Sequence, residues 1–431
     1  MISPPEHYDL VVIGAGPAGS TAATVAAGAG LRTLVVEKER FPRFRIGESL
    51  LPHGNGLLRE IGVWDKVAAA GFIEKFGARF HTANGVASKE IIFANGIIPG
   101  LEKTWQVERA KFDAILLDHA RETGAEALLA TTVTAVEERA DGHLVMLKTA
   151  GGDTRAVSAS WVIDAGGRDN LFPDEAKRRL SPGVLERRVA VYAHFEGVPR
   201  EDGWRGGHTA IVRLDDGWFW TIPIDAARTS VGLVTTSSAL RDSGLKPEAF
   251  FRHAVARHAS TRALLGDARP AGDFHVTADY SYFRENFARP RRLLAGDAAG
   301  FFDPIFSSGV YLAMHSAREA ARLVVRARRE NRDLRPAERR RYTRGLKKHA
   351  RVFLKLIHAF YDNTSFSVFM CPTPPLAIDR GVNSIVAGHS RLTWPIWWRF
   401  RLFLLVCRLQ HRLPMVPRID LGAPAAAAPS A

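Results

Sequence analysis

A glycine turn near the start of the chain constrains the fold more than any other feature. The string Gly14-x-Gly16-x-x-Gly19 comes directly after an apolar run of strand length and directly before a run of small residues. A second apolar run then ends at Glu37. The string alone is weak evidence, but this strand–turn–helix–strand context is typical of a dinucleotide-binding βαβ unit. We therefore predict an α/β protein that begins with elements at 8–13, 20–29 and 32–36.

Each glycine of this turn has a separate structural role in such a unit. Gly14 permits the tight turn, Gly16 lets a pyrophosphate approach the backbone, and Gly19 lets the helix pack closely on the sheet. The N-terminus of the helix offers N–H groups and a positive dipole to phosphate. Glu37 is expected to accept hydrogen bonds from the adenosine ribose.

Composition and charge narrow the class of protein. The chain has 431 residues, 46% of them hydrophobic, which as a prior suits roughly two or three domains. The two cysteines, Cys371 and Cys407, are far apart in sequence, which favours a reducing, cytoplasmic setting. No signal-peptide core precedes Tyr8, and no apolar run is long enough to span a bilayer. The histidines form no metal-binding motif, so we expect no metal.

Much of the net charge of +14 is concentrated in one segment. From Arg322 to Arg351 the chain carries thirteen Lys or Arg residues and three acidic ones, a net charge of +10. Such a segment is either a solvated helix face or a docking surface for an acidic partner. It has few interleaved aromatic residues and no known binding motif, so we expect no nucleic-acid partner.

Three further segments resemble motifs of FAD-dependent hydroxylases, in the same order along the chain. The segment 293–300 (LLAGDAAG) resembles the Gly-Asp motif, whose aspartate, here Asp297, holds the ribityl chain. The segment 164–168 (DAGGR) resembles a second glycine-rich motif, and 107–113 resembles the segment that brings an arginine, here Arg109, near the flavin. The resemblance implies that the dinucleotide is FAD.

The segment 218–223, W-F-W-T-I-P, resembles the W-x-W-x-I-P string of flavin-dependent halogenases. From the residues alone it is a strand that ends at Pro223 and buries one face, with Trp218, Trp220 and Ile222. In the halogenase family the string is credited with blocking direct hydroxylation of the substrate by the flavin. The resemblance therefore selects one chemistry among the many that the flavin fold supports.

A lysine in the next segment resembles the essential lysine of that family. Lys75 lies in the segment 71–80, which is similar to the family's lysine segment. In these enzymes reduced flavin and oxygen convert a halide into hypohalous acid, and a primary amine can hydrogen-bond that species or trap it as a haloamine. Burial would lower the pKa of Lys75 and favour its neutral form. The resemblance implies that Lys75 is the catalytic residue.

The segment 303–310 (DPIFSSGV) resembles the family's turn that holds the halide beside the flavin. The resemblance implies that the backbone amides of Ser308 and Gly309 bind chloride or bromide, and that Val310 lies against the isoalloxazine. A turn of exposed N–H groups before a helix, here expected at 311–329, can form such an anion nest. A helix cap by Ser307 or Ser308 is the other interpretation, and the two are compatible.

Two details bear on the substrate. Phe306 stands where tryptophan halogenases carry a glutamate that is thought to assist proton removal from indole. A chain with Phe306 in place of this glutamate resembles the phenol-type branch. The resemblance implies that the substrate is an activated ring such as a phenol or pyrrole. The string Gly47-Glu48-Ser49 is shared by halogenases and isoprenoid reductases, and we expect Glu48 to be structural. The alternative is a flavin-dependent reductase or hydroxylase of the same fold that acts on a lipid or isoprenoid.

From Glu186 to Thr236 apolar and polar residues alternate between turns, which predicts an antiparallel sheet. The resemblance implies a PHBH-like FAD-binding fold, that of p-hydroxybenzoate hydroxylase, with this sheet on the substrate side and a helical C-terminal region. It also implies a separate flavin reductase that supplies FADH2, and an aromatic acceptor that is free or bound to an acyl or peptidyl carrier protein. The expected parts are a discontinuous FAD-binding domain at 1–185 and 275–330, a sheet domain at 186–274, a helical region at 331–420 and a disordered tail at 421–431.

The C-terminal region is the least informative part of the sequence. Arg335-Pro336 is expected to interrupt a long basic helical region. The segment 394–409 is rich in Trp, Phe, Leu and Arg, and it is too short and too charged to span a bilayer. Contact with a membrane surface is one possibility. We favour packing of this segment on its own domain.

Overall fold

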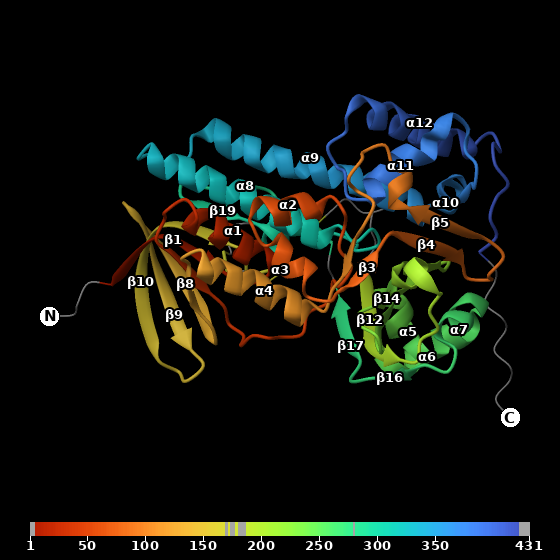
Figure 1. The fold of residues 1–431 in the computed structure, drawn as a ribbon, viewed down its shortest axis with the longest axis horizontal. Coiled ribbons are helices and arrows are strands. Elements are labelled where there is room, and N and C mark those ends of the chain that lie inside the picture. Colours follow the sequence, from red (N-terminus) through yellow and green to blue (C-terminus); the bar gives the residue numbers. More distant parts are fainter. Residues whose placement is uncertain (1–4, 169–170, 173–176, 180–186, 279–280, 422–431) are drawn as a thin grey trace.

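The computed structural model describes residues 5–168, 171–172, 177–179, 187–278 and 281–421. Within these residues, two large β-sheets lie side by side, with long helices along the first and a helical group beside the second (Figure 1). Of the expected C-terminal tail, all residues after Leu421 lie outside the described residues.

The N-terminal sheet contains the predicted βαβ unit. Its strands are β1 (Glu6–Ile13), β2 (Thr33–Val36), β7 (Glu126–Leu128), β8 (Thr131–Arg139), β9 (Gly142–Thr149), β10 (Thr154–Asp164) and β19 (Arg292–Leu294). The order is β7-β2-β1-β10-β9-β8, and β19 pairs with β10. β1 is parallel to β2 and β10, and β10 is parallel to β19, so these strands end at one edge.

Three helices pack beside this sheet: α1 (Pro17–Ala27) and α8 (Gly309–Arg329), which contact its strands, and α4 (Arg109–Glu122), which contacts α1. α1 contacts both α4 and α8. Its small residues, including Ala22, Ala23 and Ala26, are fully buried and allow these helices to approach closely. The predicted helix after the glycine turn is thereby confirmed, beginning three residues earlier than expected.

The second sheet includes the predicted antiparallel strands. Its members are β4 (Gly77–Thr82), β5 (Ser88–Ile92), β12 (Arg188–Glu196), β13 (Thr209–Arg213), β14 (Trp218–Pro223), β15 (Arg228–Thr236), β16 (Arg269–Pro270) and β17 (His275–Ala278). The order is β16-β12-β15-β14-β13-β4-β5, with β17 on β12. The strands β12 to β15 lie in the segment where the sequence predicts an antiparallel sheet. β4, which comes from much earlier in the chain, pairs with β13 in parallel.

The tryptophan strand β14 lies in the middle of this sheet and is buried on both faces. Trp218 and Trp220 belong to the core cluster on the predicted face. On the opposite face Phe219 packs against Phe251 of α6 (Pro247–Arg257), with ring centroids 5.4 Å apart. Because helices cover that face as well, the strand has no solvent-exposed side.

Two small sheets and the remaining helices complete the described fold. β3 (Ile73–Lys75) pairs with β6 (Thr104–Gln106), and β18 (Tyr282–Arg284) pairs with β11 (Lys177–Arg179) and β20 (Gly300–Phe301). The shorter helices are α2 (Gly54–Glu60), α3 (Trp64–Ala68), α5 (Ser237–Asp242) and α7 (Ala259–Leu265).

The C-terminal region is helical, as predicted, with α9 (Pro336–Tyr361), α10 (Asn363–Met370), α11 (Ile378–Val386) and α12 (Trp394–Gln410). The predicted interruption is confirmed, because α8 ends before Arg335 and Pro336 begins α9. α12 contacts α10 and α11 and buries Ile396, Phe400 and Phe403, so it packs on its own region. In the part of the chain that the structure describes, no helix has the length and apolarity to cross a membrane.

Candidate active site

The three glycine-rich motifs meet at one edge of the N-terminal sheet. The Ile13 carbonyl accepts a hydrogen bond from the Ala165 amide at 2.9 Å, and the Asp164 carbonyl accepts one from the Ala295 amide at 2.8 Å. These residues lie at the ends of the neighbouring parallel strands β1, β10 and β19. Open α/β sheets bind cofactors at the carboxyl ends of such strands.

The glycine turn is shaped as a phosphate cradle. Gly14 has φ +90°, a conformation that favours glycine, and a Cβ there would lie 2.6 Å from the Ala165 carbonyl oxygen. A Cβ on Gly19 would overlap the carbonyl oxygen of Gly14. The buried Glu37 carboxylate accepts a hydrogen bond from the Ala15 amide at 2.8 Å, which places it beside the turn.

Arg43 also lies at this turn, and the sequence analysis missed it. A Cβ on Gly16 would lie 3.4 Å from Nη2 of Arg43. The Nη1 atom of Arg43 is 3.0 Å from Oδ2 of the fully buried Asp113. A guanidinium beside a phosphate-binding turn complements a pyrophosphate. The basic P-R-F-R stretch before the G-E-S string is the sequence signal that could have found it.

Two predicted flavin ligands lie further along the same edge. Arg109 is held by Asp113 through two hydrogen bonds, at 2.8 and 2.9 Å, and by the Ile46 carbonyl at 2.8 Å. Burial raises the pKa of Asp297 to about 6, against the opposing charges of Arg168 and Arg109. The glycine cradle, the two arginines and the carboxylates are a donor and acceptor set that fits FAD.

Glu48 is buried and holds local structure. Its Oε1 lies 3.2 Å from Nε2 of His194, and its Oε2 accepts the Gly47 amide at 3.1 Å. The string that contains it thereby connects the loop before α2 with strand β12. These contacts agree with a structural carboxylate.

Lys75, the last residue of β3, is almost completely buried. Its Nζ donates to Oγ of Ser49 at 2.7 Å and to the Leu50 carbonyl at 3.2 Å, and it lies over the Phe93 ring, 5.3 Å from the centroid. In the described part of the chain, no carboxylate pairs with it. Burial lowers the pKa of Lys75 to about 7, so the neutral amine is well populated near neutral pH.

A neutral hydrogen-bond network extends from this lysine. The Ser49 hydroxyl lies 3.2 Å from the Thr209 hydroxyl, which accepts a hydrogen bond from Nε2 of Gln106 at 2.9 Å. All three side chains are buried. Since none carries a charge, the network fixes the amine without forcing it to stay protonated. Thr209 and Gln106 were not predicted, because they lie on strands β13 and β6, far from Lys75 in sequence.

The turn before α8 has unpaired backbone amides. Ser307 has φ +53°, an uncommon conformation for a residue other than glycine. Ser308 occupies the N-cap position, but its side chain makes no capping hydrogen bond, so that part of the capping interpretation is wrong. Within the described residues, the N–H groups of Ser308, Gly309 and Val310 have no hydrogen-bond acceptor. α8 begins at Gly309, two residues earlier than expected, which leaves this end open to an anion.

Lys75 and this turn share a small cavity of about 10 Å³. Its lining includes Lys75, Thr209, Ile305, Phe306 and Ser307. A volume of that size holds roughly one water molecule. The structure thus brings the predicted catalytic lysine and residues 305–307 of the predicted halide turn to one common space, although they are far apart in sequence.

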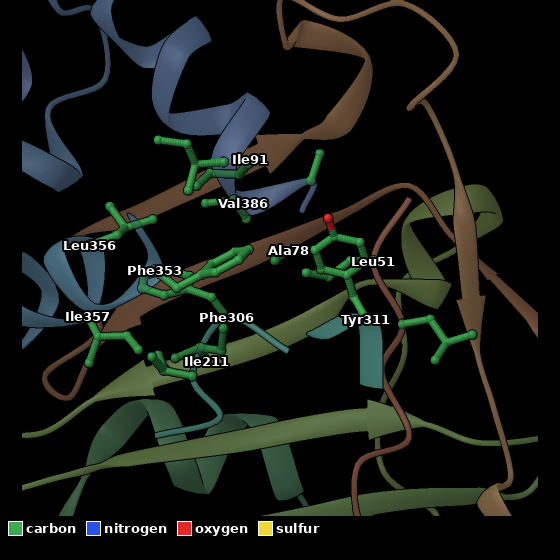
Figure 2. Packing of buried hydrophobic residues seen from close by; sticks show 14 of the residues in the cluster. Leu51, Ala78, Ile91, Ile211, Phe306, Tyr311, Phe353, Leu356, Ile357 and Val386 are labelled. Atoms are coloured by element: carbon green, nitrogen blue, oxygen red, sulfur yellow. The ribbon is translucent and has the colours of Figure 1, made fainter. Parts of the chain in front are cut away.

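Phe306 closes one wall of the cavity with apolar contacts. Its ring lies 6.1 Å from that of Phe360 and 6.2 Å from those of Phe80 and Phe369, centroid to centroid. Figure 2 shows Phe306 among apolar side chains of α9 and the neighbouring strands. No acid or base is contributed at this position.

A hydrogen-bonded link joins the tryptophan strand to the same turn. Nε1 of Trp218 donates to the Tyr361 hydroxyl at 2.7 Å, and that hydroxyl donates to Oδ2 of Asp303 at 2.6 Å. Oδ1 of Asp303 accepts the Ile305 amide at 3.1 Å. Burial raises the pKa of Asp303, and the Tyr361 hydrogen bond opposes that rise. Tyr361, at the end of α9, was not predicted, because nothing near it in sequence marks it.

Trp220 has a different role from Trp218. Its Nε1 donates to the Ser230 hydroxyl at 3.1 Å, and its ring lies flat over Gly232 on the neighbouring strand, where a Cβ would overlap it. Pro223 ends β14, as expected. The two tryptophans therefore fix β14 in two directions, one toward the 303–310 turn and one toward β15.

Tyr361→Phe is expected to weaken this link. Loss of the hydroxyl leaves Nε1 of Trp218 without its acceptor and removes the hydrogen bond to Oδ2 of the buried Asp303, which should lower the free energy of unfolding by about 1–3 kcal/mol. We expect halogenation to fall about tenfold, which corresponds to about 1.4 kcal/mol. Urea denaturation and product formation measure the two effects.

Tyr342→Phe is the matched control, because its buried hydroxyl donates to the Leu294 carbonyl at 2.8 Å, away from the turn. It should cost stability but leave turnover unchanged. Equal turnover losses in both variants would contradict a specific role of Tyr361.

Comparisons with known proteins agree with this geometry. The FAD binding domain family matches residues 7–344. The 1H-pyrrole-2-carbonyl-[peptidyl-carrier protein] chlorinase of Pseudomonas fluorescens is 35% identical over 350 residues, covering 75% of this chain and 77% of the chlorinase. A flavoprotein/dehydrogenase from Cytophaga hutchinsonii and the flavin-dependent brominase Bmp2 have related structures, with TM-scores of 0.86 and 0.83. Each is 27% identical and covers 94% of this chain and 99% of its own. The chain belongs to the FAD-binding flavin-dependent halogenases.

Proposed function

We propose that this halogenase chlorinates or brominates an electron-rich aromatic ring, of phenol or pyrrole type, while the ring is bound to a carrier protein. The observation that carries the proposal is the buried, carboxylate-free amine of Lys75, which shares a cavity with the 303–310 turn. A flavin reductase or hydroxylase needs neither a reactive amine nor an anion nest at that place.

FAD, when bound and reduced, supplies with oxygen the oxidising power that turns a halide into hypohalous acid. The glycine cradle, Arg43 and Asp297 would hold it, and a separate reductase would reduce it. The open N–H groups of Ser308 and Gly309 would hold the halide at the positive end of α8. Val310, on the first turn of that helix, would face the ring system of the cofactor.

The neutral amine of Lys75 then acts as the halogen carrier. Its nitrogen attacks the halogen of hypohalous acid, which forms an N–halogen bond and releases water. The aromatic carbon next takes the halogen from nitrogen and gives up its proton, so that the amine is restored. Ser49 and the Leu50 carbonyl orient the amine, and the apolar wall at Phe306 keeps bulk water away. A phenol or pyrrole needs no glutamate at position 306, because its own heteroatom donates electron density.

A tethered acceptor is supported by relationship and by charge. The chlorinase from Pseudomonas fluorescens is named for a pyrrole-2-carbonyl group on a peptidyl-carrier protein. The basic segment from Arg322 to Arg351 suits an acidic partner. Related proteins include a chlorinase and a brominase, so the assay below offers both chloride and bromide.

The halogenation rate is expected to rise with pH and to level off above about pH 8. Since burial lowers the pKa of Lys75 to about 7, about a tenth of the amine is neutral at pH 6. The logarithm of kcat should therefore climb with unit slope below pH 7. FADH2 oxidation at each pH serves as the reference. A rate that instead falls from pH 6 to 8 would show that the ammonium form of Lys75 is the active one, acting as a hydrogen-bond donor.

The test supplies the purified protein with a flavin reductase, FAD, NADH, oxygen and either chloride or bromide. Pyrrole-2-carboxyl and 4-hydroxybenzoyl groups are offered as free acids and as thioesters on a peptidyl carrier domain. A halogen mass shift on an acceptor supports the proposal, and the reacting form distinguishes free from tethered substrate. Oxidation of FADH2 with hydroxylated or reduced products, and no halogen incorporation with either halide, would overturn it in favour of the reductase or hydroxylase.

A further inference from the structure

The solvent-facing side of α9 carries a row of cations that no carboxylate neutralises. Five exposed residues, which we call the α9 basic row, make it up: Arg341, Arg344, Lys348, Arg351 and Lys355. In the described structure none of the five forms an ion pair or a hydrogen bond with another side chain. The chain has no Asp or Glu from Arg339 to Tyr361. The positive charge of this face is therefore left to the solvent.

The α9 basic row is a continuous feature of one helix face. Its members follow one another at alternating steps of three and four residues, the spacing that keeps side chains on one side of a helix. At 1.5 Å per residue the row is about 21 Å long. That length suits contact with a small folded domain.

Four other cations of the basic segment are paired with carboxylates, unlike those of the row. These pairs are Arg322 with Glu60, Arg328 with Asp9, and both Arg326 and Arg332 with Glu338. Such residues hold α8 and the start of α9 in place. The sequence alone treated the whole +10 segment as one patch, whereas the structure separates these paired cations from the unpaired α9 basic row.

The opposite face of the same helix reaches the candidate active site. Phe353, Leu356 and Ile357 pack in the core cluster that contains Phe306 (Figure 2). The last residue of α9, Tyr361, donates its hydroxyl hydrogen bond to Asp303 in the halide turn. The row thus lies across one helix, about 10–12 Å in diameter, from the wall of the site. In Figure 1 α9 runs along an outer edge of the molecule, where a partner can approach it.

We propose that the α9 basic row is the docking surface for the acidic carrier domain that delivers the aromatic thioester. This inference rests on the proposed function, because it requires a tethered acceptor. Carrier domains present acidic side chains around the serine that bears the flexible phosphopantetheine arm. Complementary charge raises the association rate and fixes the orientation of such an encounter. A partner held along α9 has its arm within reach of the site that this helix walls.

The test reverses three charges of the row and compares two forms of one acceptor. The variant is R341E/K348E/R351E, whose residues are exposed and unpaired, so the fold should persist. The matched control is R252E/R257E/R262E, which makes the same change in net charge on exposed residues of α6 and α7, away from α9 (Figure 1). The acceptor is a pyrrole-2-carboxyl or 4-hydroxybenzoyl thioester, either on an acidic peptidyl carrier domain or on N-acetylcysteamine.

For the α9 variant, we expect kcat/KM for the carrier thioester to fall about 10- to 100-fold, with the N-acetylcysteamine thioester changed less than about twofold. The control variant should resemble the wild type with both. The wild-type rate with the carrier should also decline steeply with added salt, and the α9 variant should respond less, because screening acts on the charges that were removed.

Each other outcome overturns the inference in a distinguishable way. Unchanged carrier kinetics in the α9 variant, or an equal loss in the control, would reject the docking surface and leave the tethered acceptor intact. A wild type that halogenates only the N-acetylcysteamine thioester would reject the tethered acceptor, and the docking surface with it. Loss of binding to phosphatidylserine vesicles, with carrier kinetics unchanged, would assign the row to a membrane surface.

Discussion

Lys75→Met is expected to lower halogenation about 10²- to 10⁴-fold, while FAD binding and FADH2 oxidation continue. Methionine fills much of the volume of the lysine stem but has no nitrogen to accept or donate a halogen. Among the described residues that line this cavity, Lys75 is the only lysine, so no neighbouring amine can replace it. Product formation by mass spectrometry and FADH2 oxidation by absorbance, recorded in the same reaction, separate loss of halogen transfer from loss of flavin chemistry.

The same substitution should not reduce stability. Burial without a carboxylate partner disfavours the charged amine, as the lowered pKa of Lys75 indicates. Between pH 7 and the ordinary lysine pKa of about 10.4, the unfolded chain binds a proton that the folded chain releases, so this group costs stability most at low pH. Replacing it with an apolar side chain removes that cost. We expect the free energy of unfolding at pH 7 to stay equal or to rise, which excludes misfolding as the cause of lost activity.

Lys89→Met supplies a matched control. Lys89 lies on β5, burial lowers its pKa, and its Nζ donates to the Phe369 and Cys371 carbonyls at 2.7 and 2.9 Å. It is therefore a second lysine with a depressed pKa, but it does not line the cavity of Lys75. We expect this variant to retain turnover per folded molecule. Halogenation by Lys75→Met within about tenfold of the wild type would reduce that lysine to a structural role.

Local patterns in the sequence were enough to predict the βαβ unit, the antiparallel strands and the break before Pro336. Each depends on residues that are close together in the chain: glycines at fixed spacing, alternating apolar residues between turns, and a proline that starts a helix. The catalytic role of Lys75 was predicted from the resemblance, whereas its burial is a finding of the structure.

Long-range contacts could not be predicted in this way. β4 joins β13 in parallel across a long stretch of sequence, and such pairing depends on the whole fold rather than on local pattern. Tyr361 links Trp218 to Asp303, although these three residues lie on separate elements. Thr209 and Gln106 reach Lys75 only because the small β3–β6 sheet packs beside β13. A polar residue in an otherwise apolar helix end, as Tyr361 is, carries no local signal of its partner.

Gly19→Ala is expected to abolish tight FAD binding and to lower the free energy of unfolding by about 3 kcal/mol or more. A Cβ at this position would overlap the carbonyl oxygen of Gly14 and lie 2.8 Å from its carbonyl carbon. Both atoms belong to the backbone of the turn, so no side-chain rotation can relieve the overlap. α1 must move away from β1, and the N–H groups at its start then no longer converge on one phosphate.

Gly345→Ala is the control for this substitution, because it makes the same chemical change in the middle of α9, where a Cβ would have no neighbour within 4 Å. It should stabilise the protein by up to about 1 kcal/mol, since alanine favours the helix, and leave FAD affinity unchanged. Fluorescence titration of FAD and urea denaturation measure both variants. If Gly19→Ala bound FAD as tightly as the wild type, the close contact between α1 and the turn would not be what shapes the cofactor site. The opposite signs expected for two Gly→Ala changes make the steric argument directly testable.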